Sequence, residues 1–189
     1  VELVEELARR CVAYRDRGIV GLGIGGPEKA LPPQPYAKAF SIARDGGLGP
    51  VPHAGAVCGP ESIRETIDAL GANRIRHGIS AIDDPELTKE LVARQIVLDV
   101  CPTSNLRTKA VADLAQHPLP QLIEAGLLCT VNTDDPAMFN TDLGREHDLG
   151  GGLGVSPKAL YDAGVVGALC DDHPRTRLAA LGASASWPS

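Results

Sequence analysis

One stretch decides the fold: Leu127-Leu128-Cys129-Thr130-Val131-Asn132-Thr133-Asp134-Asp135-Pro136. An apolar run that ends at a proline is typical of a buried strand leading into a turn. Side chains on a strand alternate between its two faces, so adjacent carboxylates point apart unless the chain is already turning. Like charges side by side repel, and a metal or a hydrogen-bonded ligand is the usual reason for such a pair. Taken alone, the segment favours a solvated turn, and the rest of the sequence reverses that preference.

Four similar apolar runs precede this strand, at residues 19–24, 51–56, 74–78 and 96–101. Segments with helical spacing lie between them, such as the apolar stripe of Ile63, Ile67 and Leu70. Each repeat of strand and helix takes about 20–30 residues, and this alternation implies a parallel sheet with helices packed outside. A closed eight-stranded barrel typically needs about 250 residues. The pattern alone leaves two folds open, part of such a barrel or an open doubly wound sheet, and the length favours the second.

Helices are also predicted at both ends of the chain. Residues 1–17 have an apolar face, with charged residues opposite, formed by Leu3, Leu7, Cys11 and Tyr14. The glycines of residues 148–154 argue against a helix there, whereas Ser156-Pro157 predicts a helix that begins here and runs to Cys170. An amphipathic segment from Pro174 to Leu181 precedes residues 182–189, which we expect to be a loose tail.

The composition indicates one globular domain. The 189 residues are 43% hydrophobic and 22% charged, and the net charge of −6 argues against nucleic-acid or anionic-membrane partners. No run is long and apolar enough to span a bilayer, and no signal segment opens the chain. The five cysteines are scattered without a CxxC spacing, a usage typical of reduced cysteines. We therefore expect a cytoplasmic protein.

Polar residues that bear chemistry fall at the ends of the predicted strands. His53, His77 and Asp134 each lie at or next to the carboxyl end of a strand, the edge where parallel α/β folds bind ligands. Two imidazoles and a carboxylate that converge there form a zinc or iron site. Any one of them alone is more often structural. Cys101 to Asn105 is interpreted as a loop-shaping element or a polar turn, and Arg74 and Arg76 as salt-bridged or solvent-facing residues.

The order and spacing of several motifs resemble the adenosine deaminase family. The motifs are His53-Ala54-Gly55, Gly59-Pro60-Glu61-Ser62, Arg74-Ile75-x-His77-Gly78, Val100-Cys101-Pro102-Thr103-Ser104-Asn105 and Asn132-Thr133-Asp134-Asp135-Pro136. Gly21 to Glu28 is similar to the bacterial version of the preceding strand, and the likeness covers about residues 1–145. The resemblance implies a zinc-dependent (β/α)8 TIM barrel of the metal-dependent hydrolase type. Residues 1–189 would form a single incomplete barrel domain with about strands 4 to 8 and their outer helices.

The resemblance also implies a reaction and a set of roles. Family members hydrolyse the 6-amino group of purine nucleosides to a 6-oxo group and release ammonia. His53 and Asp134 would be zinc ligands, and His77 would orient and help deprotonate the attacking water, whose pKa zinc lowers towards about 7. Asp135 would bind purine N7 and the Gly26 backbone N–H would bind N3. Adenosine is the default substrate, and the Gly-Gly-Pro-Glu variant also suits relatives that act on other 6-aminopurine nucleosides such as aminodeoxyfutalosine.

Two departures from the family pattern affect catalysis. Ala56 stands where the family has the glutamate that delivers a proton to N1, and the loss of a general acid commonly lowers the rate by about 10²–10⁴. The sequence contains no His-x-His pair, from which the family obtains two further zinc ligands. We therefore expect an incomplete, weakly held zinc and an impaired or inactive enzyme. Arg76 also stands where the family usually has glycine.

Two other readings compete with a purine nucleoside deaminase. The first is a catalytically inactive deaminase-like protein or fragment that binds nucleoside or a partner. An open strand edge where the third barrel strand would pair favours self-association or cover by another chain. The second is a general metal-dependent amidohydrolase, which the combination of Thr133-Asp134-Asp135-Pro136 and His53-Ala54-Gly55 disfavours.

Overall fold

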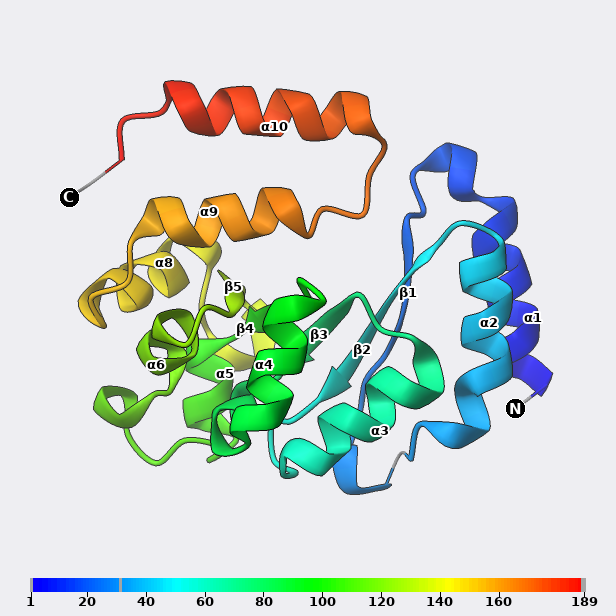
Figure 1. Cartoon of the computed structure of the whole chain (residues 1–189), viewed down its shortest axis with the longest axis horizontal. Helices are drawn as coiled ribbons and strands as arrows, with labels where there is room; N and C mark the ends of the chain where they lie inside the picture. Colours follow the sequence, from blue (N-terminus) through cyan, green and yellow to red (C-terminus); the bar gives the residue numbers. More distant parts are fainter. Residues whose placement is uncertain (1, 31, 188–189) are drawn as a thin grey trace.

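Five parallel strands form one sheet, in the order in which they follow along the chain. The computed structural model describes residues 2–30 and 32–187. The strands are β1 (Gly21–Ile24), β2 (Gly49–Ala54), β3 (Arg74–His77), β4 (Val97–Val100) and β5 (Leu128–Val131). The structure confirms the predicted parallel α/β fold, and all five strands lie within or next to the ranges that the hydrophobic pattern indicates. Within the described residues the sheet stays open, with β1 and β5 as its two edges (Figure 1).

Helices follow the strands, as the alternation requires. The α-helices are α1 (Glu2–Ala13), α2 (Ala37–Asp45), α3 (Pro60–Leu70), α4 (Pro85–Ala93), α5 (Pro102–Arg107), α6 (Leu119–Glu124), α7 (Pro136–Phe139), α8 (Leu143–Gly152), α9 (Pro157–Val166) and α10 (Asp172–Ser184). Short 3-10 helices are η1 (Arg15–Arg17), η2 (Glu28–Ala30), η3 (Gln34–Tyr36), η4 (Ile79–Asp83) and η5 (Leu114–Gln116). α9 packs against β5 and α10 packs on α9 (Figure 1). No helix in the described ranges is long and apolar enough to cross a membrane.

The main core lies between one face of the sheet and the outer helices. Ile75, Leu98 and Cys129 share that face because they are in register on β3, β4 and β5. They pack with helix residues such as Ile63 and Leu87, all almost completely buried. Burial of one such aliphatic side chain stabilises the fold by about 1.5–3 kcal/mol. A second, smaller core joins α1, α2 and β1.

The opposite face of the sheet, called the polar face below, carries charged residues. His53, Arg76, Asp99 and Thr130 follow one another in register across β2 to β5. The guanidinium of Arg74 donates to both oxygens of Asp99, and the Thr130 hydroxyl donates to the same carboxylate at 2.7 Å. The period of two along each strand therefore separates an apolar core from a polar surface that leads to the carboxyl ends of the strands.

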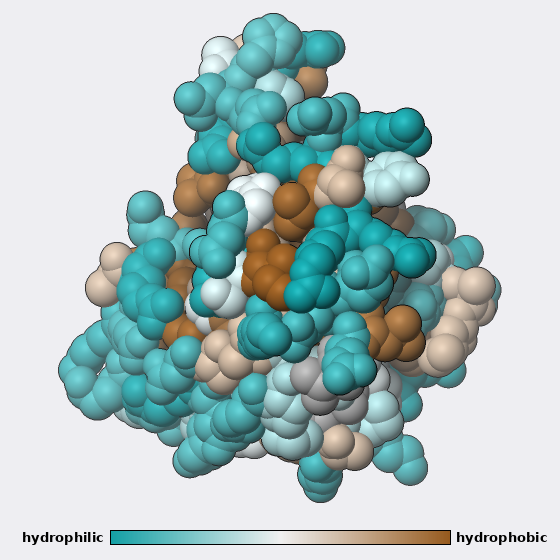
Figure 2. Space-filling model, turned by 90° about the vertical axis from the view of Figure 1, so that its right-hand side faces the viewer, coloured by the Kyte–Doolittle hydropathy of each residue, from teal (hydrophilic) through white to brown (hydrophobic). Residues whose placement is uncertain are grey.

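The α1 helix differs from its sequence-based interpretation. The expected apolar face is largely exposed, with 82% of Leu3 and 51% of Leu7 accessible to solvent, whereas Glu5 and Ala8 are buried. Ala8 packs in the second core because its small side chain lets α1 approach α2 closely. Figure 2, which views the side of the molecule where α1 and α2 lie, shows apolar side chains gathered in the middle of a hydrophilic surface.

The C-terminal region also differs from expectation. α8 continues through Gly150 to Gly152 although glycines disfavour helices, and α9 ends at Val166 instead of Cys170. α10 reaches Ser184 and so includes the first residues of the segment 182–189 that the composition predicts to be loose. The Trp187 indole donates to the carbonyl of Gly182 at 2.8 Å, and residues 188 and 189 lie outside the described residues.

Candidate active site

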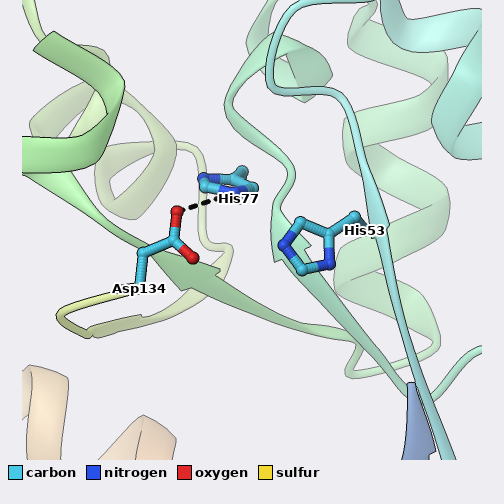
Figure 3. Close-up of side chains that lie close together, drawn as sticks. All are labelled: His53, His77 and Asp134. Carbon is cyan, nitrogen blue, oxygen red and sulfur yellow. Dashed lines mark ion pairs between the residues drawn. The ribbon is translucent and has the colours of Figure 1, made fainter. Parts of the chain in front are cut away.

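His53, His77 and Asp134 meet at the carboxyl edge of the sheet. His53 lies near the end of β2, His77 ends β3, and Asp134 follows β5. One possible ligand atom from each side chain lies within 4.8 Å of those of the other two, and His77 Nε2 is 3.7 Å from Asp134 Oδ2. Figure 3 shows the three side chains pointing toward one another, His53 and His77 from two strands and Asp134 from the turn after β5. The tertiary structure thus brings together three residues that are distant in sequence.

The imidazole of His53 is held with Nε2 free. Its Nδ1 donates to the carbonyl oxygen of Ile24 at 2.9 Å, so Nε2 carries the lone pair and faces the site. Burial lowers the pKa of His53, and the nearby Arg76 lowers it further. The ring lies so close to the backbone that a side-chain Cβ on Gly25 would be 2.9 Å from His53 Cε1. Residue 25 must therefore be glycine, because a side chain there would clash with the His53 ring.

Asp134 lies in a tight turn that separates the two adjacent carboxylates. Its φ of 55° is in the left-handed region, which is uncommon outside glycine and often marks functional sites. The Ser104 hydroxyl donates to Asp134 Oδ2 at 2.7 Å and fixes that carboxylate. Asp135 is exposed at the N-terminal end of α7. The turn therefore directs the two neighbouring carboxylates to different places, and they do not lie against each other.

All five residues predicted to form the site line one cleft. The cleft has a volume of about 460 Å³, in the range of small-molecule sites. Its lining includes Gly26, His53, His77, Asp134 and Asp135. It also includes the guanidinium-bearing Arg76, which forms no ion pair with any other residue that the structure describes.

Glu28 is a site residue that sequence reasoning missed. Its carboxylate accepts the backbone N–H groups of Ala56 at 3.1 Å, Val57 at 2.9 Å and Cys58 at 3.2 Å, together with that of Gly55. It also accepts the Ser62 hydroxyl at 2.8 Å. Burial by itself would raise the pKa of Glu28, but these hydrogen bonds outweigh it and hold the pKa below its ordinary value. Glu28 therefore shapes the loop that follows His53.

Two further buried residues, Asn105 and His117, connect to His77. Asn105 Nδ2 lies 3.2 Å from His77 Nδ1, and Asn105 Oδ1 lies 3.3 Å from His117 Nε2. The backbone N–H of Leu119 donates to His117 Nδ1 at 3.1 Å. Burial lowers the pKa of His117 to about 4, so this imidazole is neutral at pH 7. Only the position of Asn105 after a strand could have indicated its role from sequence, and His117 offers no such signal.

The donor set has the chemistry of a zinc site. His53 Nε2 presents a lone pair, Asp134 presents a carboxylate, and nitrogen and carboxylate oxygen are ligands that zinc commonly takes. Burial, and then the neighbouring His53, also lower the pKa of His77, so both imidazoles stay neutral at pH 7. A neutral imidazole is the form that a metal requires. The residues present therefore fit a zinc ion, with His53 and Asp134 as the ligands that this chain can supply.

Comparison with known proteins identifies relatives over almost the whole length of this chain. The model of the family described as adenosine deaminase matches residues 1–179. An aminodeoxyfutalosine deaminase of Acidothermus cellulolyticus is 56% identical over 195 aligned residues, which cover 100% of this chain and 55% of that protein. An adenine deaminase of Chelativorans sp. is 38% identical and is matched over 94% of this chain and 56% of its own length. The chain spans about half the length of these curated relatives.

Solved structures share the same arrangement of elements. An adenine deaminase from Arthrobacter aurescens has a TM-score of 0.81 at 31% identity, covering 93% of this chain and 57% of that one. A zinc-bound amidohydrolase from Burkholderia ambifaria has a TM-score of 0.85 at 28% identity, covering 95% of this chain and 52% of that one. The five-stranded sheet therefore corresponds to part of the TIM barrel of these deaminases and amidohydrolases.

Proposed function

Because this chain belongs to the adenosine deaminase family, we propose that its cleft serves the hydrolytic deamination of a 6-aminopurine nucleoside to the 6-oxo product and ammonia. The observation that carries the proposal is the cleft that Gly26, His53, His77, Asp134 and Asp135 line together. The similarity to the Acidothermus cellulolyticus protein makes aminodeoxyfutalosine the first substrate to test, with adenosine as the second.

The proposed roles follow from where each group lies. His53 and Asp134 would hold zinc, and zinc would supply Lewis-acid activation of water by lowering its pKa towards about 7. His77 hydrogen-bonds the attacking water or the developing oxyanion, since its Nε2 faces Asp134 across 3.7 Å. Gly26 follows β1 and Asp135 follows β5, so they lie at opposite edges of the sheet and approach the purine from two sides. Both ring nitrogens are hydrogen-bond acceptors, so the Gly26 N–H donates to N3 and the carboxyl group of Asp135 donates to N7 through its O–H.

We propose further that catalysis by this chain is impaired. Ala56 has no group that can donate a proton to purine N1. Catalytic zinc sites usually take at least three protein ligands, and His53 and Asp134 are two. Binding of nucleoside without turnover is therefore the alternative function, and the methyl side chain of Ala56 is the observation that favours it.

The test uses a fusion in which the N-terminal half of the Acidothermus cellulolyticus relative precedes this chain. Zinc is added to the fusion, and deamination of each of the two nucleosides is measured as a decrease in the absorbance of the 6-aminopurine. We expect measurable deamination in the fusion, its loss in Asp134→Asn, and its retention in the exposed control His173→Gln. A folded, zinc-loaded fusion that deaminates neither nucleoside would contradict the proposed reaction.

The same fusion tests the role of Ala56. The variant Ala56→Glu restores a general acid and should raise kcat by about 10²–10⁴. Equal rates for both forms would show that Ala56 does not limit catalysis. Calorimetric titration of the unfused chain with each nucleoside then separates binding without turnover from an absence of binding.

A further inference from the structure

The hydrogen bonds that lead from α6 to the candidate active site have a defined direction. The backbone N–H of Leu119 can only donate, so His117 Nδ1 accepts and carries a lone pair. His117 is neutral at pH 7, since burial lowers its pKa to about 4, and its proton is therefore on Nε2. That proton is donated to Asn105 Oδ1, 3.3 Å away.

The orientation of Asn105 then determines the proton on His77. Because Oδ1 accepts from His117, the amide group Nδ2 faces His77 Nδ1 at 3.2 Å and donates to it. His77 Nδ1 therefore carries a lone pair, and the proton of the neutral ring lies on Nε2. Nε2 is the atom that faces Asp134, at 3.7 Å. We infer that Asn105 and His117 are positioning residues that hold His77 as the Nε2–H tautomer, directed into the cleft.

Burial makes this order of donors and acceptors stable. Asn105 is fully buried, His117 is 3% exposed and His77 is 6% exposed, so solvent offers little replacement for a lost partner. The Asn105 backbone is itself fixed, because its N–H donates to Cys101 and its carbonyl accepts from Val111. Rotating the amide by 180° would set its NH₂ group against His117 N–H and leave both donors unpaired.

His53 and His77 consequently present opposite groups to the same cleft. His53 donates through Nδ1 to Ile24 and turns an Nε2 lone pair toward the site. His77 accepts at Nδ1 and turns an Nε2–H toward it. Although His77 lies within ligand distance of the other two groups, its resting tautomer is a hydrogen-bond donor and is unsuited to hold a metal through Nε2.

The chemical consequence rests on the proposed function. A donor aimed at the cleft can orient a water or stabilise the oxyanion that develops during attack on C6. His77 takes up no proton at Nε2 until it has given its own away. Asn105 and His117 touch neither substrate nor reacting atoms, so they act through His77 alone.

The first test is a long-range ¹H–¹⁵N correlation spectrum of the imidazoles in the ¹⁵N-labelled 189-residue chain at pH 7, with chelator and without nucleoside. We expect His77 and His117 as Nε2–H tautomers and His53 as the Nδ1–H tautomer. A wild-type spectrum with His77 as the Nδ1–H tautomer overturns the inference. The measurement needs no activity, so it stands even if the fusion shows no deamination.

Variants then assign the effect to His117. In His117→Phe the donor to Asn105 is lost and the amide is free to rotate, so a measurable share of His77 should become Nδ1–H. His117→Gln retains an amide donor toward Asn105 and should restore the wild-type tautomer, while exposed His173→Gln leaves it unchanged. If folded His117→Phe shows the wild-type tautomer of His77, His117 does not control that tautomer. If His117→Phe does not fold, the spectra of the wild type and of His117→Gln still test the inference about the His77 tautomer.

Discussion

At the scale of single residues, the candidate active site depends on side chains that hold other side chains. His53 is held by Ile24, His77 by Asn105, and Asp134 by Ser104. Ile24 is the last residue of β1, and Ser104 and Asn105 follow β4. Each of these partners therefore comes from a different strand than the residue that it holds. Such support is needed because a reactive group that is free to rotate loses the geometry on which catalysis depends.

Glu28 leads to a prediction about the loop after His53. Glu28→Gln replaces one acceptor oxygen with an NH₂ group that faces backbone N–H groups, and we expect a loss of about 1–3 kcal/mol in the free energy of unfolding. Glu124→Gln, an exposed change on α6, is the matched control and should alter stability little. Urea denaturation at pH 7 measures both, and equal stabilities for the two variants would contradict the role of Glu28.

The acid dependence of that contribution has a definite sign. The pKa of Glu28 is lower in the folded chain, so its stabilisation is complete above the unfolded value of about 4.3 and is lost as the pH falls below it. Glu28→Gln should therefore unfold with a shallower pH dependence below about pH 4 than the wild type.

At the scale of the elements, α8 shows tertiary contacts overriding helix propensity. Its sequence ends in three glycines, yet it is helical to Gly152. Asp142 caps its first turn by accepting the N–H of Arg145 at 3.0 Å. The fully buried Glu146 accepts the backbone N–H of Thr103 at 3.1 Å and the Thr141 hydroxyl at 2.5 Å. The hydrogen bond from Thr103 holds α8 against the start of α5.

Removing Glu146 should loosen α8. In Glu146→Ala two half-buried donors lose their acceptor, and we expect a loss of about 1–3 kcal/mol in the free energy of unfolding. Amide hydrogen exchange should rise throughout α8, since its glycines add little helix propensity of their own. Asp148→Ala, an exposed change on the same helix, is the control. Unchanged exchange in Glu146→Ala would show that α8 is stable without this anchor.

At the scale of the whole molecule, the buried histidines make stability depend on pH. The pKa of His117 falls from about 6.5 in the unfolded chain to about 4 in the fold. A lowered folded pKa means that the stabilisation is complete above about pH 6.5 and is lost as the pH falls toward 4. The contribution is roughly 3 kcal/mol. His53 and His77 have lowered pKa values as well and act in the same direction.

Substitution isolates the part that His117 contributes. Between pH 7 and pH 4.5, His117→Gln should lose less stability than the wild type, because the residue that must take up a proton on unfolding is gone. Urea unfolding at the two pH values gives the difference. A wild-type loss no greater than that of His117→Gln would show that another group governs acid unfolding.

The open sheet also predicts self-association. Leu3 and Leu7 on α1, together with Ile19 and Val20 before the edge strand β1, are exposed apolar residues. Apolar side chains are also visible on the side of the molecule where α1 lies (Figure 2). We expect the double variant Leu3→Lys and Leu7→Lys to shift sedimentation toward a smaller species. Leu181→Lys, exposed on α10, should leave the sedimentation unchanged. A wild-type chain that sediments as a monomer at high concentration would contradict the prediction.

The sequence by itself determined the parallel α/β fold. The spacing of apolar residues such as Ile63, Ile75 and Leu98, and the alternation of strands and helices along the chain, are local properties that can be seen in the sequence. It also indicated His53, His77 and Asp134, because each follows a strand and all carboxyl ends of a parallel sheet meet at one edge. Only the tertiary structure decided which face of α1 is buried, that α8 forms despite its glycines, and that Glu28, Asn105 and His117 support the site. Those outcomes depend on contacts between residues far apart in the chain, and a hydrogen bond between such residues leaves no periodic trace in the sequence.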